Sequence, residues 1–150
     1  MEAYIKKFNE LSLEELYKIL RLRNEVFVVE QNCVYQDADG KDVKAIHLFM
    51  KDEDEIIAYV RIFKPGKYFD MSSIGRVVVH PKYRGQNLGK TIMKKAMGYV
   101  INDLKENNIK ISAQTYLKKF YNELGFIEKG EEYLEDGIPH IKMLYTNKKI

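Results

Sequence analysis

The sequence lacks several features that would assign it to a particular class of protein. Its 150 residues include no tryptophan and a single cysteine, Cys33. Because a disulfide needs two cysteines, a disulfide within the chain is excluded. No stretch approaches the roughly 18 apolar residues that a membrane-spanning helix needs, and no apolar run at the N-terminus resembles a signal peptide. These absences predict a cytoplasmic protein with no membrane partner.

An excess of charge of one sign is also missing. The 25 lysines and arginines nearly balance the 22 aspartates and glutamates, which leaves a formal net charge of +3. The lysines are dispersed rather than gathered in one stripe, so no nucleic-acid partner is expected. The three histidines and the cysteine are scattered without the spacing of metal ligands, so no metal site is expected either.

What is present is the composition of one globular domain. A chain of 150 residues suits a single domain over residues 1–150 and can bury about 70% of its unfolded surface. Hydrophobic residues make up 45% of the chain, and it contains only three prolines. We find no repeat, no low-complexity segment and no linker, so a second domain is not expected.

Hydrophobic periodicity predicts the order of the secondary structure. Ser12 and Glu15 form the pattern of a capping box, and apolar residues at helical spacing follow it. The expected strands cover residues 4–11, 47–51, 56–64, 74–80, 110–115 and a hairpin over 126–145, and the expected helices cover residues 13–28, 88–105 and 117–124. The resulting order, β-α-β-β-β-α-β-α-β-β, predicts an α/β (α+β) fold with a mixed central sheet of about six or seven strands flanked by helices.

The stretch VVVHPKYRGQNLGKT, residues 77–91, joins a β-branched strand to a basic turn and the start of a helix. Helix N-termini carry unpaired N–H groups and partial positive charge, so they bind anions. Gly85 and Gly89 let a ligand approach the backbone, and Asn87 tolerates left-handed geometry. Arg84 adds donors that suit phosphate. The stretch therefore indicates a site for a phosphate-bearing ligand, although a basic turn before an ordinary helix has the same spacing.

The segment GQNLGKT also approaches the phosphate loop of nucleotide hydrolases, GxxxxGK[ST]. It is one residue short between the glycines, and the convergence of N–H groups on a phosphate depends on that length. The following strand ends in Gln114 and Thr115 rather than in an aspartate that would bind Mg²⁺. A nucleotide hydrolase is therefore a minor alternative.

The same residues resemble the acetyl-CoA-binding signature of the GNAT N-acetyltransferase superfamily, [QR]xxGx[GA] after a central strand. Arg84 and Gly89 match its first and last positions, and Asn87 stands where the family usually has glycine. KKFYNELGF looks like the family's FYxxxGF segment. FVVEQNCVYQD, IGRVVV and YLEDGIPHIKM look like the ElaA-type branch, so the resemblance covers roughly residues 13–145.

This resemblance implies a GNAT fold with a V-shaped cleft beside the central strand and acetyl-CoA as the co-substrate. The pantetheine arm would pair with the backbone of Val77, Val78 and Val79. Gln114 occupies a place where many relatives carry an asparagine near the cofactor. The pyrophosphate would be bound by backbone N–H groups of the turn, which comprises Arg84, Gly85, Gln86, Asn87, Leu88, Gly89 and Lys90.

The resemblance also implies direct transfer of the acetyl group to an amine. The backbone amide of Val78 or Val79 would stabilise the oxyanion, and Tyr121 would protonate the leaving sulfur. The alternative role of Tyr121 is structural: an aromatic side chain that packs a helix against the sheet. The sequence does not single out one general base. The candidates are Glu30, His47, Glu135 and His140, and a chain of water molecules could replace any of them. Cys33 is expected to be structural.

The acceptor is expected to be a small amine or an exposed protein amine, and its identity is not encoded in a motif. Two acidic loops, one with Asp37, Asp39 and Asp42 and one with Glu135 and Asp136, would attract a cationic acceptor if both border the cleft. Superfamily members often pair C-terminal strands between subunits, so a homodimer is a further expectation. The alternative function is a GNAT module that binds acyl-CoA without turnover, as a sensor or interaction domain.

Overall fold

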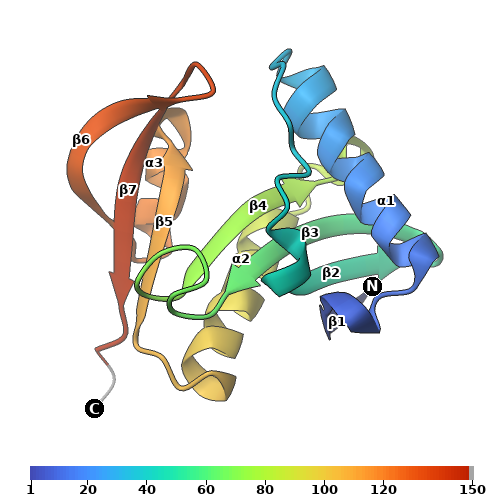
Figure 1. Cartoon of the computed structure of the whole chain (residues 1–150), viewed down its shortest axis with the longest axis horizontal. Coiled ribbons are helices and arrows are strands. Elements are labelled where there is room, and N and C mark those ends of the chain that lie inside the picture. Colours follow the sequence, from blue (N-terminus) through green and yellow to red (C-terminus); the bar gives the residue numbers. More distant parts are fainter. Residues whose placement is uncertain (149–150) are drawn as a thin grey trace.

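A computed structural model of the chain describes residues 1–148, and over these residues it contains seven strands and three α-helices (Figure 1). The strands are β1 (Glu2–Lys7), β2 (Ile46–Asp52), β3 (Glu55–Phe63), β4 (Ser73–Val79), β5 (Asn108–Gln114), β6 (Ile127–Glu135) and β7 (Ile138–Thr146); the helices are α1 (Leu13–Arg23), α2 (Leu88–Gly98) and α3 (Lys118–Glu123). The predicted order of elements is confirmed.

The strands form two antiparallel sheets rather than the single mixed sheet that we expected. One has the order β1-β2-β3-β4 and the other β5-β7-β6. The only parallel pairing between them in residues 1–148 is a bridge between Ser72 and Ile109, supported by the bond from the Lys110 N–H to the Ser72 carbonyl at 2.9 Å. Beyond this bridge β4 and β5 diverge, as Figure 1 shows.

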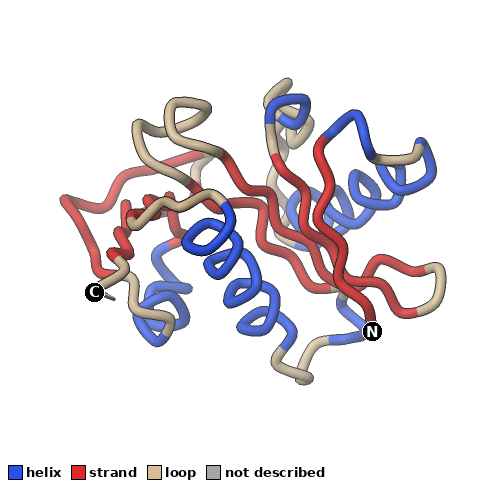
Figure 2. Tube along the Cα trace, turned by 90° about the horizontal axis from the view of Figure 1, so that it is seen from below, coloured by secondary structure: helices blue, strands red, loops and turns tan. Residues whose placement is uncertain are grey.

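The first sheet is covered on both faces, which explains why β3 reads as a nearly continuous apolar run. Ile19 of α1 packs in one core cluster with Phe49 and Tyr59. Ile92 and Met93 of α2 belong to the larger cluster, on the opposite face. Figure 2 shows the two long helices on opposite sides of the strands. A strand buried on both sides needs apolar residues at every position rather than at alternate ones.

The first helix begins as predicted but ends differently. Glu15 N–H donates to the Ser12 hydroxyl at 3.0 Å, and Ser12 N–H donates to the Glu15 carboxylate at 2.9 Å, which confirms the capping box. After Arg23 the helix widens into a π-helical segment, Asn24–Glu30, instead of ending near residue 28. Such widened turns often occur at functional sites. This one delivers Glu30 and Gln31 to the opening between the sheets.

A β-bulge shapes β4 at the same opening. Arg61 pairs with Gly75 and Tyr59 pairs with Val78, so β4 contains one extra residue in this interval. Arg76 lies within it and has a φ of 53°. A bulge bends its strand and increases the local twist. The bulge therefore accompanies the divergence of β4 from β5 and turns the Arg76 side chain toward the space between them.

Candidate functional site

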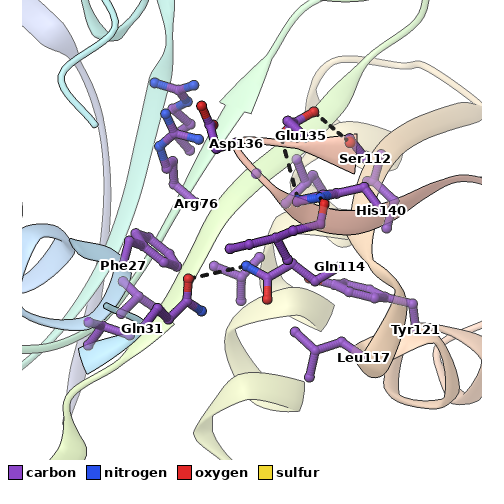
Figure 3. Close-up of a pocket in the computed structure, with 18 of the residues that line it drawn as sticks. Phe27, Gln31, Arg76, Ser112, Gln114, Leu117, Tyr121, Glu135, Asp136 and His140 are labelled. Atoms are coloured by element: carbon purple, nitrogen blue, oxygen red, sulfur yellow. Dashed lines mark hydrogen bonds and ion pairs between the residues drawn. The ribbon is translucent and has the colours of Figure 1, made fainter. Parts of the chain in front are cut away.

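A cavity of about 640 Å³ lies between the two sheets. Its walls come from β4 on one side and from β5, β7 and α3 on the other, and the π-helical segment closes one end (Figure 3). Eight of the predicted site residues line it: Glu30, Val77, Val78, Val79, Arg84, Gln114, Tyr121 and His140. The remaining turn residues from Gly85 to Lys90 lie outside its lining. The fold thus brings the predicted side chains together from five separate segments.

The backbone edge of β4 faces the cavity without a neighbouring strand. β4 pairs with β3 on one side only, and within residues 1–148 its pairing toward β5 stops at the bridge from Ser72. Val77, Val78 and Val79 all border the cavity. An open strand edge can bind an extended ligand through main-chain hydrogen bonds. This geometry fits the amide-containing pantetheine arm of a coenzyme A thioester.

The turn before α2 adopts the geometry of an anion-binding loop. Gly85 and Asn87 both have left-handed conformations, with φ values of 87° and 62°. Asn87 precedes the first residue of α2 and its side chain makes no capping hydrogen bond, so the helix N-terminus is not closed by its own cap. A Cβ added to Gly89 would lie 3.5 Å from the Phe120 ring. The departure from the family pattern at Asn87 therefore preserves the left-handed turn that glycine usually adopts.

Two cations of this turn already have partners. Arg84 donates to both oxygens of the Glu30 carboxylate, at 2.5 and 2.6 Å. The hydrogen bond from Arg84 lowers the pKa of Glu30 below its ordinary value, so Glu30 is an anion that binds Arg84 rather than an unpaired base. The Lys90 ammonium lies 2.7 Å from Glu123. A pyrophosphate would have to compete with Glu30 for Arg84.

Gln31 contacts the opposite wall. Its side-chain carbonyl lies 3.4 Å from the Gln114 amide nitrogen, so the adjacent residues Glu30 and Gln31 bridge to two different elements across the cavity (Figure 3). The Gln114 carbonyl oxygen is buried and has no hydrogen-bond partner within residues 1–148. Buried polar atoms are nearly always paired. An unpaired acceptor at the wall of a cavity indicates a donor that a bound ligand supplies.

Tyr121 is held by aromatic contacts and lines the cavity. Its ring meets those of Phe120 and Phe126 edge to face, with centroids 5.0 and 6.0 Å away. Burial raises the pKa of the Tyr121 phenol well above its ordinary value, so the hydroxyl keeps its proton at neutral pH. No residue in the described part of the chain forms a hydrogen bond with that hydroxyl. The hydroxyl therefore has a proton to donate and no partner among residues 1–148.

His140 and Glu135 form a second polar group on the wall built by β5, β6 and β7. The Nδ1 atom of His140 lies 2.7 Å from the Ile138 carbonyl, and because a carbonyl only accepts, Nδ1 carries the proton. In the neutral ring, Nε2 then presents a lone pair, and it lies 3.6 Å from a Glu135 oxygen. The other Glu135 oxygen accepts a hydrogen bond from the Ser112 hydroxyl at 3.1 Å. Figure 3 shows this group facing the cavity.

His47, the other histidine considered as a base, does not line the cavity. It is fully buried, with the Tyr59 hydroxyl 2.6 Å from Nδ1 and the Asp42 carbonyl 2.9 Å from Nε2. Burial lowers its pKa. The carbonyl must accept from Nε2, so Nδ1 accepts from the tyrosine. Both ring nitrogens are used within the core, so His47 serves the fold and not proton transfer in the cavity.

The expectation that both acidic loops attract a cation is wrong for the first loop. Its three aspartates bind three arginines in one connected cluster, which we call the arginine–aspartate network: Arg23, Arg61, Arg76, Asp37, Asp39 and Asp42. Burial opposes ionisation of Asp39, but bonds from Arg61 and Lys41 outweigh it and hold the pKa of Asp39 well below its ordinary value. The network carries equal numbers of positive and negative charges, so it offers no uncompensated carboxylate to a ligand.

Local sequence patterns contain little indication of this network, because its members are far apart in the chain. Arg23 contacts Asp37 and Arg61 contacts Asp39 across 14 and 22 positions of the chain. Arginine in a helix and in a strand normally suggests solvent exposure, yet Arg23 is completely buried and Arg61 nearly so. The acidic composition of the loop after the first helix is the one available signal, and it also favours a surface that attracts a cationic substrate.

Cys33 ties this loop to the opposite sheet. Its thiol is buried and lies 3.5 Å from the carbonyl of Asp136, at the tip of the β6–β7 hairpin. The contact joins the two rims of the cavity.

Among residues 1–148, no helix is both long and apolar enough to cross a bilayer. The same residues contain no group of three histidine, cysteine, aspartate or glutamate side chains arranged to bind a metal ion.

Comparison with known proteins identifies close relatives. The family model described as an acetyltransferase (GNAT) domain matches residues 9–147. Protein ElaA of Escherichia coli K12 is 42% identical over 137 residues, which are 90% of each chain, and its crystal structure has a TM-score of 0.89 over 96% of this chain and 98% of that one. An acyl-CoA N-acyltransferase from Pseudomonas aeruginosa is 38% identical, with a TM-score of 0.91 over 97% of this chain and all of that one.

The fold is also shared with an aminoglycoside 6'-N-acetyltransferase whose crystal structure is a complex with coenzyme A. The two chains are 15% identical and their TM-score is 0.71, over 95% of this chain and 96% of that one. At this identity the likeness concerns the fold alone. It shows that the fold accommodates coenzyme A in that protein.

Proposed function

This chain belongs to the GNAT acetyltransferase family, and from that premise we propose that it transfers an acetyl group from acetyl-CoA directly to the amine of an acceptor. One observation supports this above the others. The open edge of β4 and Tyr121, whose hydroxyl has no partner within residues 1–148, border the same cavity. The strand edge would hold the thioester, and the hydroxyl would supply a proton to its sulfur.

Binding of acetyl-CoA would use the two open features of β4 and the following turn. The pantetheine arm would pair with the backbone of Val77, Val78 and Val79, as an added strand does. The pyrophosphate would lie at the N-terminus of α2, on the N–H groups that follow Arg84. Gln114, whose side-chain oxygen is buried and unpaired within residues 1–148, would accept a hydrogen bond from an amide N–H of the arm.

The reaction moves two protons and exchanges one bond. The acceptor nitrogen attacks the thioester carbon, so the new C–N bond forms as the negative charge develops on oxygen, and the backbone amide of Val78 or Val79 stabilises that charge. The C–S bond then breaks, and the sulfur takes the proton of Tyr121. His140 accepts the proton of the amine at Nε2, because its Nδ1 position is already protonated and bound to the Ile138 carbonyl.

The test is amine-dependent release of coenzyme A thiol from acetyl-CoA. We expect turnover with at least one amine in a broad panel, and a fall in kcat of about 100-fold in Tyr121→Phe. Tyr17→Phe is the matched control, because Tyr17 is an exposed tyrosine of α1 outside the cavity. Acetyl-CoA binding without thiol release for any amine would contradict the enzyme and support the module that binds without turnover.

Thermal melting with acetyl-CoA and, separately, with Mg-ATP tests the co-substrate itself. A ligand at about 100 times its Kd stabilises a fold by roughly 2.7 kcal/mol. We expect acetyl-CoA alone to raise the melting temperature. A rise with Mg-ATP alone would contradict the proposal and favour the nucleotide alternative.

A further inference from the structure

The carboxylates around the cavity differ in whether they have a cationic partner. Glu30 is bound by Arg84, and the aspartates of the first loop are bound within the arginine–aspartate network. Glu135 and Asp136, at the end of the β6–β7 hairpin, both line the cavity. Neither has a lysine or arginine within 4.0 Å among the described residues, and the one ion-pair contact of Glu135 is with His140. Uncompensated negative charge is therefore concentrated at this end of the cavity.

Glu135 and His140 are arranged as two hydrogen-bond acceptors without a donor between them. The His140 side chain is more than nine-tenths buried, and its Nε2 lies 3.6 Å from the carboxylate oxygen, too far for a hydrogen bond. An ammonium group has three N–H donors and can reach both atoms at once. Lys142 of β7 donates to the Tyr133 hydroxyl at 2.7 Å, and that hydroxyl contacts Ser112. Two hydroxyl groups thus separate this lysine from Glu135.

Asp136 supplies a second negative charge next to the first. It follows Glu135 directly, adopts a φ of 52°, and its backbone carbonyl is contacted by the Cys33 thiol. The carboxylate is thus attached to a backbone that both rims of the cavity hold in place. A second cation on the acceptor, a few bonds from the reacting amine, can pair with it.

We propose that the acceptor is an aliphatic amine that carries a second cationic group, with the reacting amine bound by Glu135 and His140 and the second cation bound by Asp136. This proposal rests on the transferase function proposed above. An acceptor that carries a carboxylate instead would find no unpaired cation among the described residues that line the cavity, because Arg61, Arg76 and Arg84 are all paired with carboxylates. It would also meet two carboxylates.

The decisive experiment compares three acceptors of equal chain length: a diamine, a monoamine and an ω-amino acid. We expect kcat/KM for the diamine to exceed that for the monoamine by about tenfold, equivalent to about 1.4 kcal/mol, and the amino acid to be the poorest acceptor. Asp136→Asn should remove the preference for the diamine, because asparagine also tolerates the positive φ but carries no charge. Glu135→Gln should raise KM for both amines. Glu132→Gln, an exposed glutamate of β6 outside the cavity, is the control.

Binding separates failure of this proposal from failure of the transferase function. Each amine is titrated by calorimetry into the protein saturated with coenzyme A. Stronger binding of the diamine that is lost in Asp136→Asn supports the proposal even if no acetyl group is transferred, in which case the function is wrong. Turnover of the monoamine equal to that of the diamine, or a diamine preference unchanged in Asp136→Asn, overturns the proposal and leaves the function intact. Absence of any diamine binding overturns the proposal as well.

Discussion

The two walls of the cavity treat buried polar groups in opposite ways. Behind β4, every arginine and aspartate of the arginine–aspartate network has an oppositely charged partner. On the wall formed by the second sheet and α3, the Gln114 oxygen, the Tyr121 hydroxyl and His140 Nε2 have no hydrogen-bond partner within residues 1–148. We call these three groups the unpaired wall. Removing a charge or a polar atom from water is costly. In the network oppositely charged side chains offset most of that cost, although the Nε atoms of Arg61 and Arg76 have no hydrogen-bond partner within residues 1–148. On the unpaired wall a ligand would offset it.

This contrast separates residues that maintain the fold from residues that act on a substrate. Substitution in the network should reduce stability, and substitution on the unpaired wall should reduce binding or rate while leaving stability nearly unchanged. Four predictions test this separation, in order of decreasing effect.

The largest effect is expected for Asp42→Asn. One Asp42 oxygen accepts from Arg23 at 2.8 Å and from Arg61 at 2.9 Å, and both arginines are buried. Loss of the carboxylate leaves two buried cations with one fewer partner, so the free energy of unfolding should fall by about 3–5 kcal/mol. Urea denaturation measures it. Glu135→Gln, on the other wall, should change it by less than about 1 kcal/mol; equal losses in the two variants would contradict the separation.

Acid titration of stability provides a second readout of the same cluster. Burial opposes ionisation of Asp39 and Asp42, but the bonds from the arginines dominate, so the pKa values of both carboxyl groups lie below the ordinary value. Groups with a lowered folded-state pKa stabilise the fold above the unfolded pKa of about 3.9, and this stability is lost as the pH falls toward the folded values. Asp39→Asn should therefore flatten the decline of stability below about pH 4.

The second prediction compares two tyrosine hydroxyl groups, one that is hydrogen-bonded in the core and one that belongs to the unpaired wall. The Tyr59 hydroxyl donates to His47 at 2.6 Å within the core, so Tyr59→Phe should lower the free energy of unfolding by about 1–3 kcal/mol, because it leaves a buried acceptor unpaired. Tyr121→Phe removes a hydroxyl that no described residue binds, so it should leave stability almost unchanged while kcat falls by about 100-fold. Denaturation and thiol release measure the two quantities in each variant. Loss of stability in Tyr121→Phe comparable to that in Tyr59→Phe would show a packing role.

The third prediction concerns the ion pair between Glu30 and Arg84. This pair is formed within the protein, as in the network, but it involves an arginine that would bind the ligand. Both side chains are 44% exposed, so the pair contributes little to stability. It does occupy the arginine that the phosphate-binding turn presents. Glu30→Gln should therefore lower the Kd for acetyl-CoA by about two- to fivefold. Equilibrium titration measures this, with Glu25→Gln, an exposed residue of the same π-helical segment, as the control.

The same variant tests Glu30 as one of the four candidate general bases that the sequence suggested. A base that acts in the chemical step would lower kcat when replaced, with little change in the Kd for acetyl-CoA. A tighter complex with kcat preserved would favour the role as a competing anion.

Local patterns carried most of the information about the fold. The capping box at Ser12 and the β-branched run before His80 determine where a helix begins and where a central strand lies, and both depend on neighbours in sequence. The order of all ten elements follows from such patterns. The π-helical widening after Arg23 and the bulge at Arg76 have no local signature here, and they depend on how the sheet and its helices pack.

The site was predictable to a similar extent. The turn after β4 and the Tyr121 segment are contiguous motifs, so they could be found by resemblance. The pairing of Arg23 with Asp37, and the approach of Glu135 to His140 across the hairpin, are properties of the folded chain. The sequence therefore showed which residues carry charge but could not show which charges neutralise one another, and that distinction decides which acidic loop can attract a substrate.

The smallest effect is expected at Asn87, because the groups that would bind the phosphate there are backbone N–H groups rather than side chains. Asn87 has φ and ψ of 62° and 24°, and its side chain makes no capping bond, so its contribution is conformational. Asn87→Gly should therefore change the Kd for acetyl-CoA by less than about twofold, because glycine adopts this conformation without strain.

Asn87→Val is the informative partner of that substitution. A β-branched residue is strained at a positive φ by about 1–2 kcal/mol, and relief of the strain would turn the N–H groups of the loop away from the phosphate. We expect weaker acetyl-CoA binding in Asn87→Val, measured by the same titration. If instead glycine and valine weaken binding equally, the asparagine side chain itself contacts the ligand. The Asn87 side chain would then belong with the unpaired groups of the cavity, because the ligand rather than the protein would supply its hydrogen-bond partners.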